Sequence, residues 1–140
     1  MAEHIGVVTL ILDQTKQKIL LGKRKNAYKA GFYGLPGGRL ELKETLIESA
    51  KRELKEETRL DAEQQTYIGV VRDLQESYNF IHFAYSCTSY SGTLETTEPE
   101  KCEGWEWHSL SSLPQDILPG HLAAINLYKY PENGSLYELL

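Results

Sequence analysis

The chain has 140 residues, of which 41% are hydrophobic and 25% are charged. This length suits one domain over residues 1–140 and is too short for two ordinary domains. The formal net charge of −5 disfavours duplex nucleic acid as a partner, because duplex-binding proteins usually present a basic surface. We find no secretion signal in residues 1–12 and no apolar run near the about 18 residues that cross a bilayer, so we expect a cytoplasmic protein without membrane contact. Cys87 and Cys102 lack metal-site spacing, and we expect free thiols.

The first half of the chain predicts two strands, a loop and a helix. Residues 5–12 are a continuous apolar run rich in β-branched side chains, and residues 18–24 form a second run; we expect both in one mixed sheet. Gly and Pro crowd residues 31–38, which predicts a loop without regular structure. A helix over residues 45–58 should follow, because Thr45 and Glu48 have the spacing of a capping box.

The second half predicts further strands and a final helix. The strands are expected at residues 67–71, 78–87 and 104–108, with a polar loop at 94–103, and the helix at 121–130. This order favours one α/β domain, a mixed sheet between helices that cover both of its faces. We assign four bulky aromatic side chains to the core rather than to a binding surface: Phe80, Phe83, Trp105 and Trp107.

Three glutamates are predicted to share one side of the first helix. At ~100° per residue, Glu53, Glu56 and Glu57 fall together, beside an apolar stripe. The stripe consists of Ile47, Ala50 and Leu54. Like charges at this spacing cost roughly 0.2–0.5 kcal/mol per pair, so their clustering indicates a bound cation. Carboxylate oxygens suit Mg²⁺, which bridges to substrate phosphates and assists attack of water on them.

The segment from Gly38 to Leu60 resembles the nudix box. That pattern is a glycine, five residues, a glutamate, seven residues, and then Arg-Glu-hydrophobic-x-Glu-Glu-x-Gly-hydrophobic. Its places are taken in register by Gly38, Glu44, Arg52, Glu53, Leu54, Glu56, Glu57 and Leu60. Arg59 stands where the family has its late glycine, which would end the helix in a left-handed cap, so the departure concerns the turn more than the metal site. The resemblance implies a nudix-type α/β/α sandwich.

The resemblance also implies roles for these residues. Glu53, Glu56 and Glu57 would ligate Mg²⁺, with one of them as or near the general base, and Mn²⁺ could substitute. The carbonyl of Gly37 or Gly38 would complete the metal shell. Arg52 would orient a catalytic glutamate by a charge-assisted hydrogen bond and would pair with Glu44. A further metal ligand is expected from Glu98 or Glu103 in the polar loop, and we choose Glu98.

Substrate contacts are expected outside the box. The segments 21–25, 32–41 and 98–107 resemble the nucleoside-triphosphate diphosphatases of the family. Strand alternation sends Lys23 and Lys25 to one face and Arg24 to the other, so at least one cation can reach phosphate. The candidate substrate-binding residues are Lys23, Arg24, Glu41, Gly120 and His121.

We therefore expect Mg²⁺-dependent hydrolysis of a nucleoside triphosphate, including a modified or deoxy purine nucleotide, to monophosphate and pyrophosphate. One alternative is a pyrophosphatase acting on ADP-ribose or another nucleoside-diphosphate derivative. A second is a nucleotide-binding sensor without catalysis, which has no need to cluster three acids. The preferred base and sugar depend on a few loop contacts that the sequence does not identify. A homodimer is implied by the resemblance alone.

Overall fold

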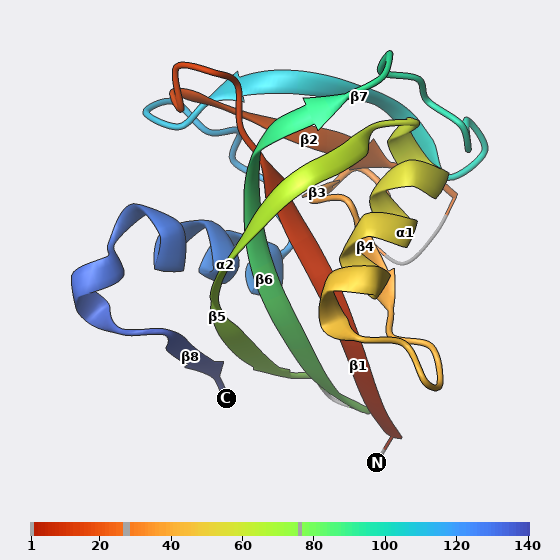
Figure 1. The fold of residues 1–140 in the computed structure, drawn as a ribbon. Helices are drawn as coiled ribbons and strands as arrows, with labels where there is room; N and C mark the ends of the chain where they lie inside the picture. The colour runs from red at the N-terminus through yellow and green to blue at the C-terminus, as the bar shows by residue number, and fades with distance from the viewer. Residues whose placement is uncertain (1, 27–28, 76) are drawn as a thin grey trace.

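The computed structural model describes residues 2–26, 29–75 and 77–140 (Figure 1). Its elements are β1 (Ala2–Ile11), β2 (Lys18–Arg24), β3 (Tyr33–Gly34), β4 (Gly37–Arg39), α1 (Leu46–Thr58), β5 (Asp61–Leu74), β6 (Tyr78–Ser91), β7 (Cys102–Ser109), α2 (Pro119–Lys129), a 3₁₀ helix (Pro131–Asn133) and β8 (Leu136–Leu139). The predicted helices and strands are all present. The segment predicted to be an irregular loop contains the short strands β3 and β4, and β8 was not predicted.

The strands form two sheets rather than one. The larger sheet has the order β4-β1-β6-β5-β8 and the smaller has the order β3-β2-β7. The larger sheet is mixed, because β1 runs parallel to β6 and β5 parallel to β8, while its other pairs are antiparallel. The prediction that β1 and β2 share one sheet is wrong. Both edges of β1 are occupied by β4 and β6, so β2 pairs with β7 instead and meets the end of β1 through a bridge between Leu12 and Ile19.

The two helices lie on opposite faces of the larger sheet (Figure 1). Helix α1 contacts β1, β4 and β5, and α2 contacts β1, β5, β6 and β8. The core under α2 includes Val8, Val71 and Ala84 from the sheet and Ile125 from the helix. A smaller core joins Ala50 of α1 to Val7 and Tyr85. The predicted α/β/α sandwich is therefore confirmed.

Helix α1 begins with the predicted capping box: Glu48 N donates to Thr45 Oγ1 at 3.1 Å, and Thr45 N donates to Glu48 Oε1 at 2.9 Å. Ala50 and Leu54 are buried as predicted, but Ile47 is 51% exposed. Ile47 is not part of the buried stripe, because Leu46, one turn before Ala50, packs against the sheet in the first turn.

The helix ends in a left-handed turn without the family's glycine. Arg59 has φ 66° and ψ 9°, and its backbone N–H donates to the carbonyl oxygen of Lys55 at 3.0 Å. A non-glycine residue adopts this conformation at some energetic cost. The turn therefore keeps the left-handed form, and the direction in which α1 ends does not depend on a glycine.

The structure describes both cysteines of the chain. Cys87 and Cys102 are free thiols. Burial raises the pKa of both thiols, which favours their protonated form. Among the described residues, no helix has both the length and the apolar character needed to cross a membrane.

Candidate active site

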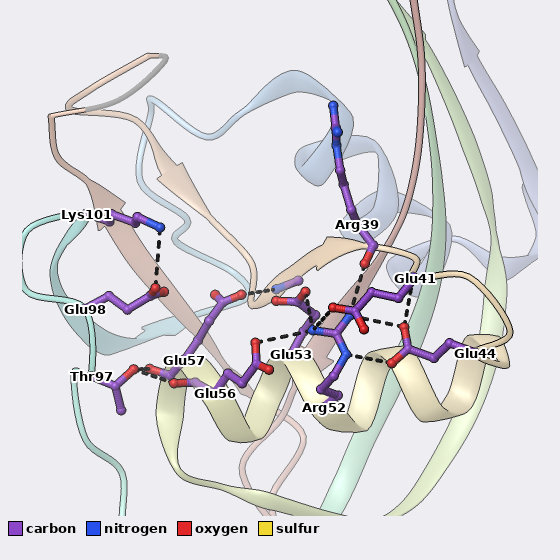
Figure 2. A network of polar contacts seen from close by, with 11 residues as sticks. Arg39, Glu41, Glu44, Arg52, Glu53, Glu56, Glu57, Thr97, Glu98 and Lys101 are labelled. Carbon is purple, nitrogen blue, oxygen red and sulfur yellow. Dashed lines mark hydrogen bonds and ion pairs between the residues drawn. The ribbon is translucent and has the colours of Figure 1, made fainter.

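Arg52 lies at the centre of the acidic cluster on α1 (Figure 2). Its Nε and Nη2 donate to the two carboxylate oxygens of Glu44 at 2.6 and 3.1 Å, and Nη2 also donates to the carbonyl oxygen of Arg39 at 3.1 Å. Nη1 donates to Glu53 at 2.9 Å and to Glu56 at 3.3 Å. The Arg52 hydrogen bonds lower the pKa of Glu44 to about 2, and Glu44 in turn raises the pKa of Arg52, so the pair stays charged.

Glu57 is held differently from the other two glutamates. Its Oε1 accepts a hydrogen bond from the backbone N–H of Gly37 at 3.3 Å. Burial, followed by the neighbouring charge of Glu53, raises the pKa of Glu57 well above its usual range, and Glu98 adds to the effect. The three glutamates of α1 leave the same side of the helix toward the β4 loop, as the periodicity predicts (Figure 2).

Gly37 and Gly38 let β4 lie close to both α1 and β1. A Cβ on Gly38 would overlap the carboxylate of Glu53, at 2.5 Å from Oε2. A Cβ on Gly37 would overlap the carbonyl oxygen of Val7 and lie 3.0 Å from Cα of Val8. The glycine pair is therefore required for Glu53 and Glu57 to lie against the β4 backbone.

The C-terminal end of α1 is fixed by side chains from later in the chain. Thr97 Oγ1 donates to the carbonyl oxygens of Glu56 and Glu57 at 2.5 and 3.0 Å, and Trp105 Nε1 donates to that of Glu57 at 3.1 Å. Carbonyl groups in the last turn of a helix have no partner within the helix. Thr97 and Trp105 therefore hold the backbone from which two of the candidate metal ligands project.

A cavity of about 490 Å³ opens beside the glutamates, within the roughly 300–1,000 Å³ typical of small-molecule sites. Glu53, Glu56 and Glu57 border it together with the Gly37–Gly38 backbone. Cationic side chains also border this cavity: Lys23, Arg24, Arg39 and Lys101. A polyanionic ligand in this cavity can contact the cations directly and the glutamates through a metal ion.

The loop acids are placed differently from one another. Glu98 borders the cavity, and its Oε2 lies 3.5 Å from Lys101 Nζ. Glu103 instead lies 3.9 Å from Lys23 Nζ, and Glu100 is exposed. Of the loop acids considered from the sequence, Glu98 is therefore the one that the structure brings to the glutamates of α1.

Glu41 and His121, two other candidates for substrate binding, differ in their position relative to the cavity. Glu41 is exposed and lies 3.6 Å from Arg52 Nη1, and it is not among the described residues that border the cavity. His121 borders the cavity, and its Nδ1 accepts a hydrogen bond from Leu35 N at 2.9 Å. Burial, followed by His82 and Arg24, lowers the pKa of His121 to about 3, so its ring is neutral.

Sequence reasoning missed several residues that line the cavity or a smaller one beside it. Phe80 and His82 of β6 border both cavities, and Asp73 of β5 borders the smaller one with Gly120. The alternation of rings at Tyr78, Phe80 and His82 was the available signal for β6, since alternate residues share one face of a strand. Asp73 carried no local signal.

The assignment of the aromatic residues to the core is corrected in part. Phe83 packs against a buried cluster as predicted. Trp105 packs against another cluster but also borders the larger cavity, and Phe80 borders both cavities. Trp107 is 37% exposed, so its assignment is wrong, because it lies on a strand of the small outer sheet.

The donor set fits a divalent cation, although no three His, Cys, Asp or Glu side chains in residues 2–26, 29–75 and 77–140 are already arranged as a metal site. Glu53 and Glu56 are turned toward Arg52, which supplies the positive charge. Glu57 is half-buried beside other carboxylates, and a nearby cation would favour its charged form. Glu53, Glu56, Glu57 and Glu98 carry carboxylate oxygens, which are the kind of hard ligand that Mg²⁺ takes.

The sequence is similar to known proteins that are named as enzymes acting on nucleotide derivatives. An ADP-ribose pyrophosphatase of Methanocaldococcus jannaschii is 35% identical over 133 residues, covering 94% of this chain and 77% of the relative. A putative 8-oxo-dGTP diphosphatase of Bacillus subtilis is 32% identical over 124 residues, covering 89% of this chain and 78% of the relative. The chain spans only about a third of the length of the Homo sapiens and Mus musculus relatives that it matches, which are named 8-oxo-dGDP phosphatases.

Comparison of the fold with solved structures leads to the same kind of protein. The crystal structure of a MutT NUDIX hydrolase from Burkholderia pseudomallei superposes with a TM-score of 0.84 and 29% identity, covering 91% of this chain and 98% of that one. Residues 2–129 match the model of the family described as NUDIX domain. Because that match spans nearly the whole chain and includes the segment that carries the glutamates, the chain belongs to the nudix hydrolase family.

Proposed function

We propose that this chain is a Mg²⁺-dependent hydrolase that cleaves a nucleoside triphosphate to monophosphate and pyrophosphate. The observation that carries the proposal is the position of Glu57, half-buried against the Gly37 backbone beside Glu53, at the edge of a cavity lined with cations. When bound there, Mg²⁺ would neutralise phosphate oxygens and stabilise the charge that develops in the transition state.

The protein's own groups would divide the remaining work. Glu53, Glu56 and Glu98 would hold the ion, with a backbone carbonyl of the glycine pair available to it. Arg52 would keep Glu53 and Glu56 in position through its hydrogen bonds to both. Glu57 would take the proton of the attacking water. Among these α1 glutamates it is the one without a described hydrogen bond to Arg52. A paired cation lowers the basicity of a carboxylate, so Glu53 and Glu56 would be weaker bases.

The substrate's phosphates would lie between the glutamates and the cations of the cavity. Lys23, Arg24 and Lys101 border this space, and Lys23 and Lys101 each have a glutamate nearby, Glu103 and Glu98. Exchange of these exposed ion pairs for phosphate contacts costs little, since such pairs contribute roughly 0–1 kcal/mol. Water would attack a phosphorus of the anhydride, and pyrophosphate would be the leaving group. The same cations would neutralise the negative charge that pyrophosphate gains.

A second candidate is pyrophosphatase activity on ADP-ribose or another nucleoside-diphosphate derivative. The relative that is 35% identical over 94% of this chain is named an ADP-ribose pyrophosphatase, which favours this alternative. The same glutamates would serve it, and the difference would lie in what the cavity accepts beyond the diphosphate. A nucleotide sensor without catalysis remains the third candidate, and it would bind these ligands without product.

One experiment separates the candidates. The purified chain is incubated with NTPs, dNTPs, ADP-ribose and dinucleoside polyphosphates, with Mg²⁺, with Mn²⁺ or with a chelator, and the products are resolved by ion-exchange chromatography. We expect monophosphate and pyrophosphate from a triphosphate, in the metal-containing samples only. AMP and ribose 5-phosphate from ADP-ribose as the sole products would establish the second candidate. Binding without turnover of any substrate would establish the third.

A further inference from the structure

A smaller cavity adjoins the proposed phosphate site. It has a volume of about 130 Å³ and shares Arg24, Phe80, His82 and His121 with the larger cavity. The rings of Phe80 and His82 lie on one face of β6, with their centroids 5.7 Å apart and their planes 6° from parallel. These two rings are parallel and stacked, and they make this side of the cavity aromatic, which suits an aromatic ligand.

Asp73 provides a buried carboxylate in this cavity. It is only 6% exposed and lies opposite Phe80 in the pairing of β5 with β6. Its Oδ1 accepts a hydrogen bond from Gln75 Nε2 at 2.6 Å, while no described residue donates to its Oδ2. Asp73 lines the cavity, so a ligand bound there could donate a hydrogen bond to Oδ2.

Gly120 keeps Oδ2 open to the cavity. A Cβ at this position would lie 2.9 Å from Asp73 Oδ2 and 3.1 Å from the ring of His82. Any other residue would therefore place its side chain between the carboxylate and the ligand. The same glycine lies in the first turn of α2, where no turn geometry requires it, so its role is to leave this space.

The two histidines add neutral hydrogen-bonding groups. His121 Nδ1 accepts from Leu35 N, so the proton of its neutral ring lies on Nε2, which is a donor. Burial lowers the pKa of both His82 and His121, although Asp73 opposes this for His82. The cavity thus combines an acceptor-only carboxylate with an imidazole N–H donor beside a flat ring.

We infer that this cavity binds the substrate's base and that Asp73 selects a base edge with two adjacent N–H donors, as guanine has, over adenine. A carboxylate only accepts, so Oδ2 and the second lone pair of Oδ1, which already accepts from Gln75, can take the N1–H and the amino group of guanine, while the His121 N–H is available to the carbonyl O6. Adenine offers its amino group beside N1, whose lone pair would face the carboxylate. The inference rests on the proposed function in assuming a nucleotide substrate.

The test compares kcat/KM for dGTP and dATP in the parent, in Asp73→Asn and in Asp61→Asn. We expect the parent to prefer dGTP by about tenfold to a hundredfold, as the loss of a hydrogen bond to a charged group implies. Asp73→Asn should lose this preference and gain activity on dATP, because an amide both donates and accepts and so matches adenine. Asp61→Asn, at the exposed start of the same strand, should behave as the parent.

Binding measurements keep the inference separate from the proposed function. The affinities for dGMP and dAMP, measured by calorimetry, test the base contact even if no triphosphate is hydrolysed. Should Asp73→Asn fail to fold, Gly120→Ala covers Oδ2 with a methyl group while keeping the carboxylate, and it should weaken dGMP binding by about tenfold. Equal affinity of the parent for dGMP and dAMP, or an unchanged preference in folded Asp73→Asn, would overturn the inference.

Discussion

Substitution of the two glycines of β4 by alanine should separate catalysis from folding. In Gly38→Ala the new Cβ would lie 2.5 Å from Glu53 Oε2, and a relaxed contact needs about 3.5 Å, so the carboxylate must withdraw by about 1 Å. Because this carboxylate is the end of a flexible side chain, it can move without disturbing the backbone. A misplacement of this size costs about 10²-fold in kcat/KM, with stability changed by less than about 1 kcal/mol.

Gly37→Ala should mainly reduce stability, whereas Gly38→Ala should mainly reduce activity. Its Cβ would overlap the backbone carbonyl oxygen of Val7, on a strand that pairs with β4 on one side and β6 on the other. That oxygen cannot withdraw without breaking the sheet, so we expect a loss of about 1–3 kcal/mol, as for other overpacked interiors. The loss should lower Tm by roughly 3 °C per kcal/mol.

The assay pairs initial rates of pyrophosphate release from dGTP with urea unfolding of the same preparations. Gly31→Ala serves as the control for the loss of a glycine, since its Cβ would meet no atom within 4 Å; its φ of 91° adds backbone strain but leaves the glutamates untouched. If Gly38→Ala kept kcat/KM within threefold of the parent, or lost as much stability as Gly37→Ala, the assigned contact with Glu53 would be wrong.

Three further substitutions test other parts of the site. Glu57→Gln should lower kcat by about 10²–10⁴-fold with the fold intact, and a kcat within tenfold of the parent would remove Glu57 from the mechanism. The hydrogen bond from Arg52 lowers the pKa of Glu44 from 4.5 to about 2, so the pair stabilises the fold above pH 4.5 and loses this contribution as the pH falls through 2. Glu44→Gln should therefore show a flatter fall of Tm over that interval, and parallel curves would contradict the linkage. Glu98→Gln should raise the Mg²⁺ concentration for half-maximal rate roughly tenfold, and Glu103→Gln should leave it unchanged; equal effects would exclude Glu98 as the specific ligand.

The features that could be predicted from the sequence depend on neighbours along the chain. The capping box joins residues three apart, and the common side of Glu53, Glu56 and Glu57 follows from the period of one helix. The contact between Arg52 and Glu44 joins residues eight apart across the helix start. Helical geometry and one turn determine these positions, so a short segment contains the information.

The division into two sheets could not be predicted in this way. An apolar run identifies a strand but not its partner, and β1 and β2 are adjacent in sequence with a turn between them. Their separation follows from β1 being paired on both edges, with β4 beyond the glycine loop and with β6, whose paired residues lie 76 positions later. Such pairing is a property of the whole fold, which no window of residues contains.

Asp73 shows how charged residues near the end of a strand conceal a binding residue. The predicted strand at residues 67–71 ends before Asp73, while β5 extends to Leu74 and pairs regularly with β6 from Gly69 onward. Aspartate is depleted in strands, so Arg72 and Asp73 resemble the start of a loop in the sequence. The proposed base site depends on the same strand, because its continued pairing with β6 is what places Asp73 beside Phe80. Residues proposed to select a substrate are therefore harder to predict than candidate metal ligands. Except for Glu98, those ligands lie on one helix, whereas the selecting groups meet only after the sheet and a second helix have assembled.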